Sequence, residues 1–287
     1  MIPPGRTEIY YFSGTGNSLH VARELQKRLP EADLVPIVRV LREVSPKTTA
    51  NTVGFVFPNF CLTSPIPLHD FLEKVDVASA RYVFALCTRG GTPSDAFDYI
   101  NALLKRQGRR LDAQLNITMP WNHPLGKENL PALATEERMA FLEAEMQRKL
   151  DTFSQHILAH EAYLAEDTDA DYVIPQWAKA MSLWIPKSLN YELHRYMYQD
   201  MVRFYSNEKC TGCGICEKVC LSQKIQIVNQ KSVWQETVKC YGCMACINYC
   251  PQHAIQIRSR FPVHSSTPLT ARYHHPAITY KDIAGQR

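Results

Sequence analysis

Two copies of one cysteine pattern constrain this chain more than any other feature of its sequence. The segments CTGCGICEKVCLSQKIQIV, which begins at Cys210, and CYGCMACINYCPQHAIQIR, which begins at Cys240, align with an offset of 30 residues. Each copy has the spacing C-x2-C-x2-C-x3-C, and each continues into Ile-Gln-Ile. The match indicates an internal duplication.

The cysteine spacing has a chemical reason. Three thiolates two residues apart can surround one corner of an iron–sulfur cube, and the fourth cysteine of each run then ligates the other cluster. Gly212, Gly214 and Gly242 allow tight turns that bring backbone amides toward the cluster sulfurs. The predicted ligands are Cys210, Cys213, Cys216 and Cys250 for one cluster and Cys240, Cys243, Cys246 and Cys220 for the other.

Zinc is the competing interpretation, because four-cysteine zinc sites are common. Such sites usually pair two C-x2-C knuckles, whereas this chain has two overlapping triples that are each followed by x3-C. The pattern therefore favours two [4Fe–4S] clusters.

The rest of the composition is that of a soluble protein. The chain begins without a cationic segment and a long apolar run, and no stretch approaches the roughly 18 apolar residues of a membrane span. We therefore expect a cytoplasmic protein, in which thiols stay reduced and cysteines serve as ligands rather than disulfides. The net charge of +4 gives no indication of nucleic acid binding.

The first 120 residues alternate between short apolar runs and amphipathic runs. Strand-like runs cover 7–12, 33–37, 52–57, 81–87 and 115–120, and helical patterns cover 18–29, 65–75 and 94–108. This alternation predicts an α/β fold with a doubly wound, five-stranded parallel sheet. In such a sheet, ligands are expected at the carboxyl ends of the strands.

A glycine-rich loop, SGTGNS at 13–18, lies between the first predicted strand and the first predicted helix. Backbone amides at a helix N-terminus, small residues and hydroxyl groups are what a bound phosphate needs. The loop lacks the lysine of G-x-x-x-x-G-K-[ST] and the spacing of G-x-G-x-x-G, so a nucleoside triphosphate and a dinucleotide are both disfavoured. From these residues alone, a phosphate site and a simple turn both remain open.

These features together resemble known families. Residues 206–260 resemble a bacterial-type two-cluster ferredoxin, although Leu221 stands where proline usually follows the fourth cysteine. Residues 6–125 resemble the flavodoxin family, and the whole chain resembles the flavodoxin–ferredoxin fusion proteins of anaerobic bacteria and archaea. MPWNHP at 119–124 and RYHHP at 272–276 look like motifs of that fusion family.

The resemblance implies a bound FMN and names the residues that would hold it. The phosphate would lie against Ser13, Gly14, Thr15, Gly16, Asn17 and Ser18, and the isoalloxazine against Pro58, Asn59, Phe60, Thr88, Arg89, Gly90, Gly91, Trp121 and Asn122. A cation at Arg89 would favour the anionic reduced flavin and two-electron chemistry. Trp121 and Asn122 could equally be packing at the end of a strand.

The expected organisation has four parts. They are a flavodoxin-like FMN domain (1–165), a helical connector (166–205), a small α+β two-cluster ferredoxin domain (206–260) and a C-terminal extension (261–287). His274 and His275 in that extension could bind an anion or cap the domain interface, but a solvated tail is the favoured expectation. Of the remaining cysteines, Cys87 is expected to be buried packing, and Cys61 is not assigned a redox role.

The implied function is an FMN and iron–sulfur oxidoreductase. Low-potential electrons would pass through the two clusters to FMN, which would reduce a small molecule or a redox partner's cofactor. The alternative is an electron carrier that docks on a separate reductase and has no substrate pocket of its own. The aromatic-rich insertion at 119–205 favours an enzyme with a roofed pocket, and the lack of recognisable acid–base residues favours the carrier.

Overall fold

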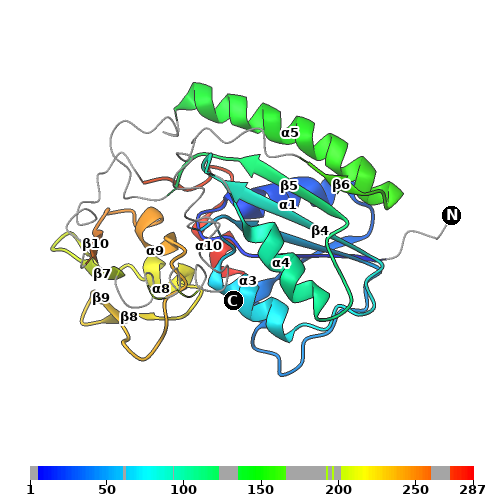
Figure 1. Cartoon of the computed structure of the whole chain (residues 1–287). Coiled ribbons are helices and arrows are strands. Elements are labelled where there is room, and N and C mark those ends of the chain that lie inside the picture. Colours follow the sequence, from blue (N-terminus) through cyan, green and yellow to red (C-terminus); the bar gives the residue numbers. More distant parts are fainter. Residues whose placement is uncertain are drawn as a thin grey trace, which may run out of the picture.

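The computed structural model describes residues 6–60, 63–92, 94–122, 135–165, 192, 196, 202–259 and 272–287. A layered α/β unit lies beside a smaller unit that carries the cysteine repeats (Figure 1). Most of the predicted connector at 166–205, the loop residue Cys61 and the segment 123–134 lie outside the described residues. No helix among the described residues is long and apolar enough to cross a membrane.

The larger unit is built on one parallel sheet with the strand order β2-β1-β3-β4-β5-β6. Its strands are β1 (Thr7–Tyr11), β2 (Ala32–Pro36), β3 (Thr52–Pro58), β4 (Tyr82–Arg89), β5 (Ala113–Thr118) and β6 (Tyr163–Leu164). The order 2-1-3-4-5 is that of flavodoxin-like folds, so the predicted fold class is confirmed. The two-residue β6, which pairs with β5, is the only strand of this sheet that the sequence pattern did not predict.

Helices cover both faces of this sheet, as its continuous apolar strands require. They are α1 (Asn17–Arg28), α2 (Ile37–Val40), α3 (Ile66–Lys74), α4 (Ala96–Lys105) and α5 (Glu136–Ala159). The helices α1 and α5 contact each other on one face, whereas α3 contacts α4 on the other (Figure 1). Every residue of β3 and β4 is buried. Gly54 of β3 leaves the space that the Phe84 ring fills, because an added Cβ would lie 2.1 Å from that ring.

The smaller unit consists of two short antiparallel pairs and short helices. Its elements are β7 (Val202–Ser206), α8 (Ile215–Val219), β8 (Ile225–Val228), β9 (Lys231–Trp234), α9 (Ala245–Asn248), β10 (Ile255–Ser259) and, after a gap, α10 (Tyr280–Ala284). β7 pairs with β10, and β8 pairs with β9. Because β7 begins at Val202, this unit includes residues that the sequence analysis placed in the connector.

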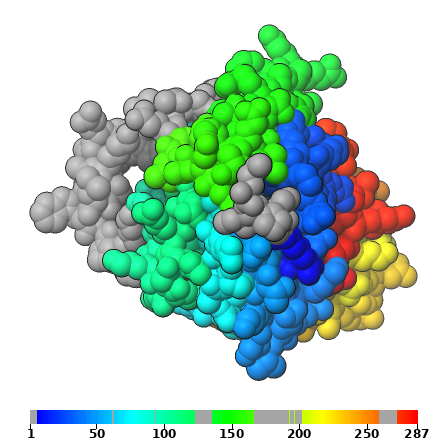
Figure 2. All heavy atoms as spheres, turned by 90° about the vertical axis from the view of Figure 1, so that its right-hand side faces the viewer, coloured from blue at the N-terminus to red at the C-terminus, as the bar shows by residue number. Residues whose placement is uncertain are grey.

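The two units share one continuous apolar core. Val219 and Tyr249 of the smaller unit and Ile278 and Ile283 of the tail join the buried residues that surround the parallel sheet. In Figure 2 the C-terminal residues, in red, lie beside the N-terminal part, in blue, and above the cysteine-rich unit, in yellow. At the closest point, a Cβ added to Gly14 would lie 2.0 Å from the backbone oxygen of Cys243.

We expect Gly14→Ala to destabilise the joined fold by about 1–3 kcal/mol, because the extra methyl group must displace the backbone of the facing loop. Thermal unfolding should show a Tm lower by about 2–4 °C for each kcal/mol. Gly285→Ala is the matched control, since its added Cβ makes only ordinary contacts at 3.4 Å. Equal melting temperatures for both variants would contradict the close contact.

Candidate functional site

The first predicted ligand set surrounds one cavity. Cys210, Cys213, Cys216 and Cys250 all line this cavity, which lies in the smaller unit. Gly212 and Gly214, with φ of 71° and 77°, adopt the left-handed turns that the loop needs to bend around this space. The amide of Ala254 donates to the Cys250 sulfur at 3.3 Å. The fourth cysteine of the second copy therefore completes the set of the first.

The second set surrounds a separate cavity. Its lining includes Cys220, Cys240, Cys243 and Cys246. The amide of Lys224 donates to the Cys220 sulfur at 3.2 Å, and the amide of Gly242 donates to the Cys240 sulfur at 3.4 Å. Both cavities thus join three cysteines of one copy to the fourth of the other, as the spacing predicts. Iron binding itself stays a prediction.

The protonation of these thiols fits metal ligands. Burial raises the pKa of Cys216 and of Cys240 to about 11, and it raises the pKa of Cys246 as well. For Cys210, burial is outweighed by hydrogen bonds from the backbone of Gly212 and Ser232, so that its pKa is lowered. When a metal ion binds, it replaces the proton of the thiol, even where burial has raised the pKa of that thiol.

The SGTGNS loop connects β1 to α1 and is completely buried. The Ser13 hydroxyl accepts a hydrogen bond from the amide of Gly16, and the Thr15 hydroxyl accepts one from Asn122. Ser18 and Thr88 share a hydrogen bond of 2.7 Å between their hydroxyl groups. The amide group of Asn17 donates to the Pro120 carbonyl at 3.0 Å.

The hydrogen-bonding groups that remain in this loop fit an anion. Ser13 and Thr15 accept bonds, so each hydroxyl still has its own hydrogen to donate. No side chain among the described residues caps the first turn of α1, which begins at Asn17. Free amides and the positive end of the helix dipole are therefore directed at the loop. Ser13, Thr15 and the first amides of α1 could hold the phosphate of FMN.

The other predicted flavin residues converge on the loop from neighbouring strands. The amide of Asn59, after β3, donates to the Thr88 carbonyl at 2.7 Å, and its side chain donates to Thr92 at 3.1 Å. Arg89 at the end of β4 is only 4% exposed and donates to the Thr92 carbonyl at 3.3 Å. The Trp121 ring, after β5, lies on Gly90, where an added Cβ would be 2.5 Å from the ring.

The structure thus gathers the carboxyl ends of β1, β3, β4 and β5, as a parallel sheet requires. The segments 13–18, 58–60, 88–91 and 121–122 lie at this common edge. Arg89, which could have been a surface residue, is buried. Whether these residues bind a flavin stays a prediction.

The cavity of the second cysteine set lies directly beside this loop. The Tyr241 side chain lines that cavity, and its ring meets the Phe12 ring edge-on with centroids 6.3 Å apart. Asn248 of α9 donates to the Asn122 carbonyl at 3.0 Å. Together with the Gly14–Cys243 contact, these bonds fix one set of thiols against the predicted phosphate loop.

The C-terminal tail closes over the outer side of the same loop. Gln286, which is fully buried, accepts from the Ser13 amide at 3.0 Å and donates to the Ser13 carbonyl at 2.8 Å. The His275 amide donates to the Thr15 carbonyl at 2.8 Å. Gly16, with φ of 103°, lies so close to Ile278 that an added Cβ would be 2.9 Å from its side chain.

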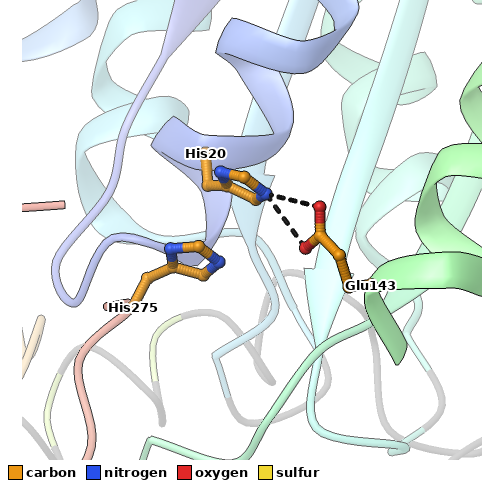
Figure 3. A group of neighbouring side chains, drawn as sticks. All are labelled: His20, Glu143 and His275. Carbon is orange, nitrogen blue, oxygen red and sulfur yellow. Dashed lines mark hydrogen bonds and ion pairs between the residues drawn. The ribbon is translucent and has the colours of Figure 1, made fainter. Parts of the chain in front are cut away.

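The expectation of a solvated tail is wrong for His275 and correct for His274. His275 is 6% exposed, because its ring stacks on His20 with centroids 3.9 Å apart. His20 in turn donates to the Glu143 carboxylate at 3.0 Å (Figure 3). The His274 side chain is exposed and lies along Tyr249.

His20, Glu143 and His275 are also the one group of potential metal ligands that the described residues bring together outside the cysteine cavities. Their ligand atoms lie within 4.8 Å of one another. The Nδ1 atom of His275 accepts from the Ala277 amide at 3.3 Å, which leaves the proton of the neutral ring on Nε2. The group therefore fits a partly buried contact that holds the tail better than a metal site.

The comparisons with known proteins agree with the cysteine pattern. A family model described as "4Fe-4S dicluster domain" matches residues 209–255. No curated protein gives a significant match. The chain joins a parallel sheet with the flavodoxin-like strand order to a segment that matches this dicluster model.

Several solved structures match part of the chain at low identity. Two-electron reduced flavodoxin from Megasphaera elsdenii is 13% identical, and the match covers 50% of this chain and 98% of that one with a TM-score of 0.29. An azoreductase from Bacillus anthracis is 13% identical over 52% of this chain and 100% of that one, with a TM-score of 0.35. NAD(P)H:quinone oxidoreductase from Methanothermobacter marburgensis is 9% identical over 51% and 95%, with a TM-score of 0.33. The flavodoxin-like assignment therefore rests on the strand order of this chain.

Acidification should loosen the tail. Burial, assisted by the nearby His20, lowers the pKa of His275 from 6.5 to about 4. The His275 ring of the unfolded chain is therefore protonated near pH 6.5, whereas that of the folded chain is protonated only near pH 4. Stability should fall across that window by on the order of 3 kcal/mol. The Asp282 carboxyl group does not account for this loss of stability. Hydrogen bonds from Thr279 and Arg23 outweigh burial and lower its pKa to about 2.

The measurement is the Tm of the native protein, His275→Gln and the control His274→Gln between pH 7.5 and 4.5. The native protein and the control should lose stability in parallel, and His275→Gln should lose less. Any acid lability of bound clusters is common to all three proteins. Identical pH profiles would show that His275 is not the titrating group.

Proposed function

We propose that this chain is an oxidoreductase that uses FMN and two [4Fe–4S] clusters. Electrons pass through the clusters to FMN, which reduces a small molecule or a redox partner's cofactor. The observation that carries the proposal is the contact between the predicted phosphate loop at Gly14 and the ligand loop at Cys243. A cysteine-rich unit that worked as a separate electron carrier would not need backbone contact with a flavin site.

The positions of the two cavities suggest an order of transfer. The Cys220, Cys240, Cys243 and Cys246 cavity adjoins the flavin loop, whereas Cys213 of the other set is exposed at the surface. A one-electron donor protein would reach the outer cluster first, and the inner cluster would then pass electrons to FMN one at a time. When bound, FMN would collect these single electrons and release them as a pair.

The alternative remains an electron carrier for a separate reductase. The exposure of Cys213 favours exchange with a protein at that end of the molecule. The two functions differ in what reoxidises the flavin. An enzyme is reoxidised by a small molecule in the absence of any second protein, and a carrier only by its protein partner.

The direct test is anaerobic purification and reconstitution, followed by iron and flavin analysis and a spectroscopic reductive titration. Two clusters and one flavin predict about eight irons and one FMN per chain. Absence of flavin after reconstitution would overturn the proposal, even if the iron content is as expected.

Removal of one inner ligand should affect one cluster only. We expect Cys243→Ala to reduce the iron content from about eight to about four per chain, because only its own cavity loses a ligand. Cys87→Ala is the matched control, since Cys87 is also a buried cysteine but lies in β4 outside both sets. Full iron content in Cys243→Ala, or equal loss in both variants, would contradict the predicted ligand sets.

The buried cation at the end of β4 should tune the flavin. Arg89→Gln is expected to lower the two-electron potential of FMN by about 30 mV, a tenfold change in the ratio of reduced to oxidised flavin. The cause is the loss of a buried positive charge that favours the anionic reduced form. Arg81→Gln, an exposed arginine at the opposite end of the same strand, is the control. A redox titration with equal flavin potentials would show that Arg89 does not act on the flavin.

A further inference from the structure

The two halves of the cysteine repeat differ in charge at one equivalent position. Lys224 occupies in the first copy the place that Ala254 occupies in the second, four residues after the last cysteine. The structure confirms that the two positions are equivalent. The Lys224 amide donates to the Cys220 sulfur at 3.2 Å, and the Ala254 amide donates to the Cys250 sulfur at 3.3 Å.

Lys224 is a buried cation. It is 8% exposed, and its ammonium group donates to the backbone carbonyls of Gln235 and Val238. Within the described part of the chain no carboxylate forms an ion pair with it. Its charge is thus held in place by neutral acceptors rather than cancelled.

This charge belongs to only one of the two cavities. Lys224 lines the inner cavity with Cys220 and Cys240, whereas the uncharged Ala254 lines the outer one. Burial lowers the pKa of Lys224, and the neighbouring Cys240 and Cys220 oppose that shift. A bound cluster, which is anionic, adds to the same attraction.

Other cations around the clusters do not produce this asymmetry. Arg272 interacts with Cys250 of the outer set and with Cys246 of the inner set, so it acts on both. Lys231, beside the Cys210 carbonyl, is exposed, as are Arg203 and Lys239 near the inner cavity. Solvent and salt screen exposed charges, whereas a buried charge keeps its effect.

We propose that Lys224 raises the reduction potential of the inner cluster above that of the outer cluster and so directs electrons toward the flavin loop. Reduction adds one negative charge to a cluster, and a nearby buried cation stabilises that added charge. In the directed step, the reduced outer cluster loses one electron and the oxidised inner cluster gains it. A low-potential one-electron donor protein supplies the electron, and FMN receives it. This inference rests on the proposed function, because it requires both clusters.

The test is a redox titration of the anaerobic holoprotein, followed by electron paramagnetic resonance of the reduced clusters. Lys224→Gln removes the charge but keeps a donor for the two carbonyls, and Lys224→Arg keeps the charge. Lys218→Gln removes an exposed charge from α8 in the same unit and is the matched control. Cys213→Ala, an exposed ligand of the outer set, leaves only the inner cluster and identifies its potential.

In Lys224→Gln one of the two potentials should fall by about 59 mV, a tenfold change in the ratio of reduced to oxidised cluster for one electron. Lys224→Arg and Lys218→Gln should stay near the native values. In Cys213→Ala the remaining cluster should have the higher of the two native potentials.

Unchanged potentials in Lys224→Gln would overturn the proposal, and so would an equal shift in Lys224→Arg. Two further outcomes would overturn the proposal even if Lys224→Gln fails to fold. One is that both clusters of the native protein have the same potential, and the other is that the cluster remaining in Cys213→Ala has the lower of the two native potentials. A native protein that binds no iron would instead refute the proposed function, so the two failures are distinguishable.

Discussion

The structure depends on one backbone contact, where the loop after β1 meets the loop that carries Cys243. With 2.0 Å between the place of a Cβ on Gly14 and the facing carbonyl oxygen, no side chain fits there. The contact brings the edge of the parallel sheet where ligands bind against one cavity of the cysteine-rich unit. The edge-on rings of Phe12 and Tyr241 and the bond from Asn248 to Asn122 pack around it. The proposed transfer of electrons from the cysteine-rich unit to the loop follows from this proximity.

The contact with Cys243 gives the glycines in SGTGNS a different role from the one that the sequence indicates. In the sequence, Gly14 and Gly16 indicate a loop that admits a phosphate closely. In the structure, both glycines make room on the outer side of the loop, Gly14 for Cys243 and Gly16 for His275 and Ile278. The groups that can donate to an anion are instead the hydroxyls of Ser13 and Thr15 and the first amides of α1. The loop is therefore shaped by two neighbours at once, with packing on one side and hydrogen-bond donors on the other.

The sequence predicted those features of the fold and of the site that depend on local residue patterns. The strands β1 to β5 and helices α1, α3 and α4 follow from periodicity, and the two cysteine sets follow from spacing. The convergence of Asn59, Arg89 and Trp121 follows from the geometry of parallel strands. Contacts between distant segments leave no such pattern, so the pairing of Gln286 with Ser13, 273 positions away, was not predictable. Lys224 is an intermediate case, since aligning the two repeats reveals it but only the structure shows that it is buried.

The closure by the tail bears on how the chain can exchange electrons. Gln286, His275 and Ile278 hold the outer side of the loop, and Arg23 of α1 pairs with Asp282 of α10 at 2.6 Å. The tail therefore holds the loop and α1, and the bond from Asn248 of α9 to the Asn122 carbonyl holds the cysteine-rich unit beside the same loop. A carrier domain on a mobile linker must dissociate and rebind for each electron, but a fixed pair of sites transfers electrons without that step. In the proposed function, the outer cysteine set, with its exposed Cys213, is the surface where a donor protein would dock.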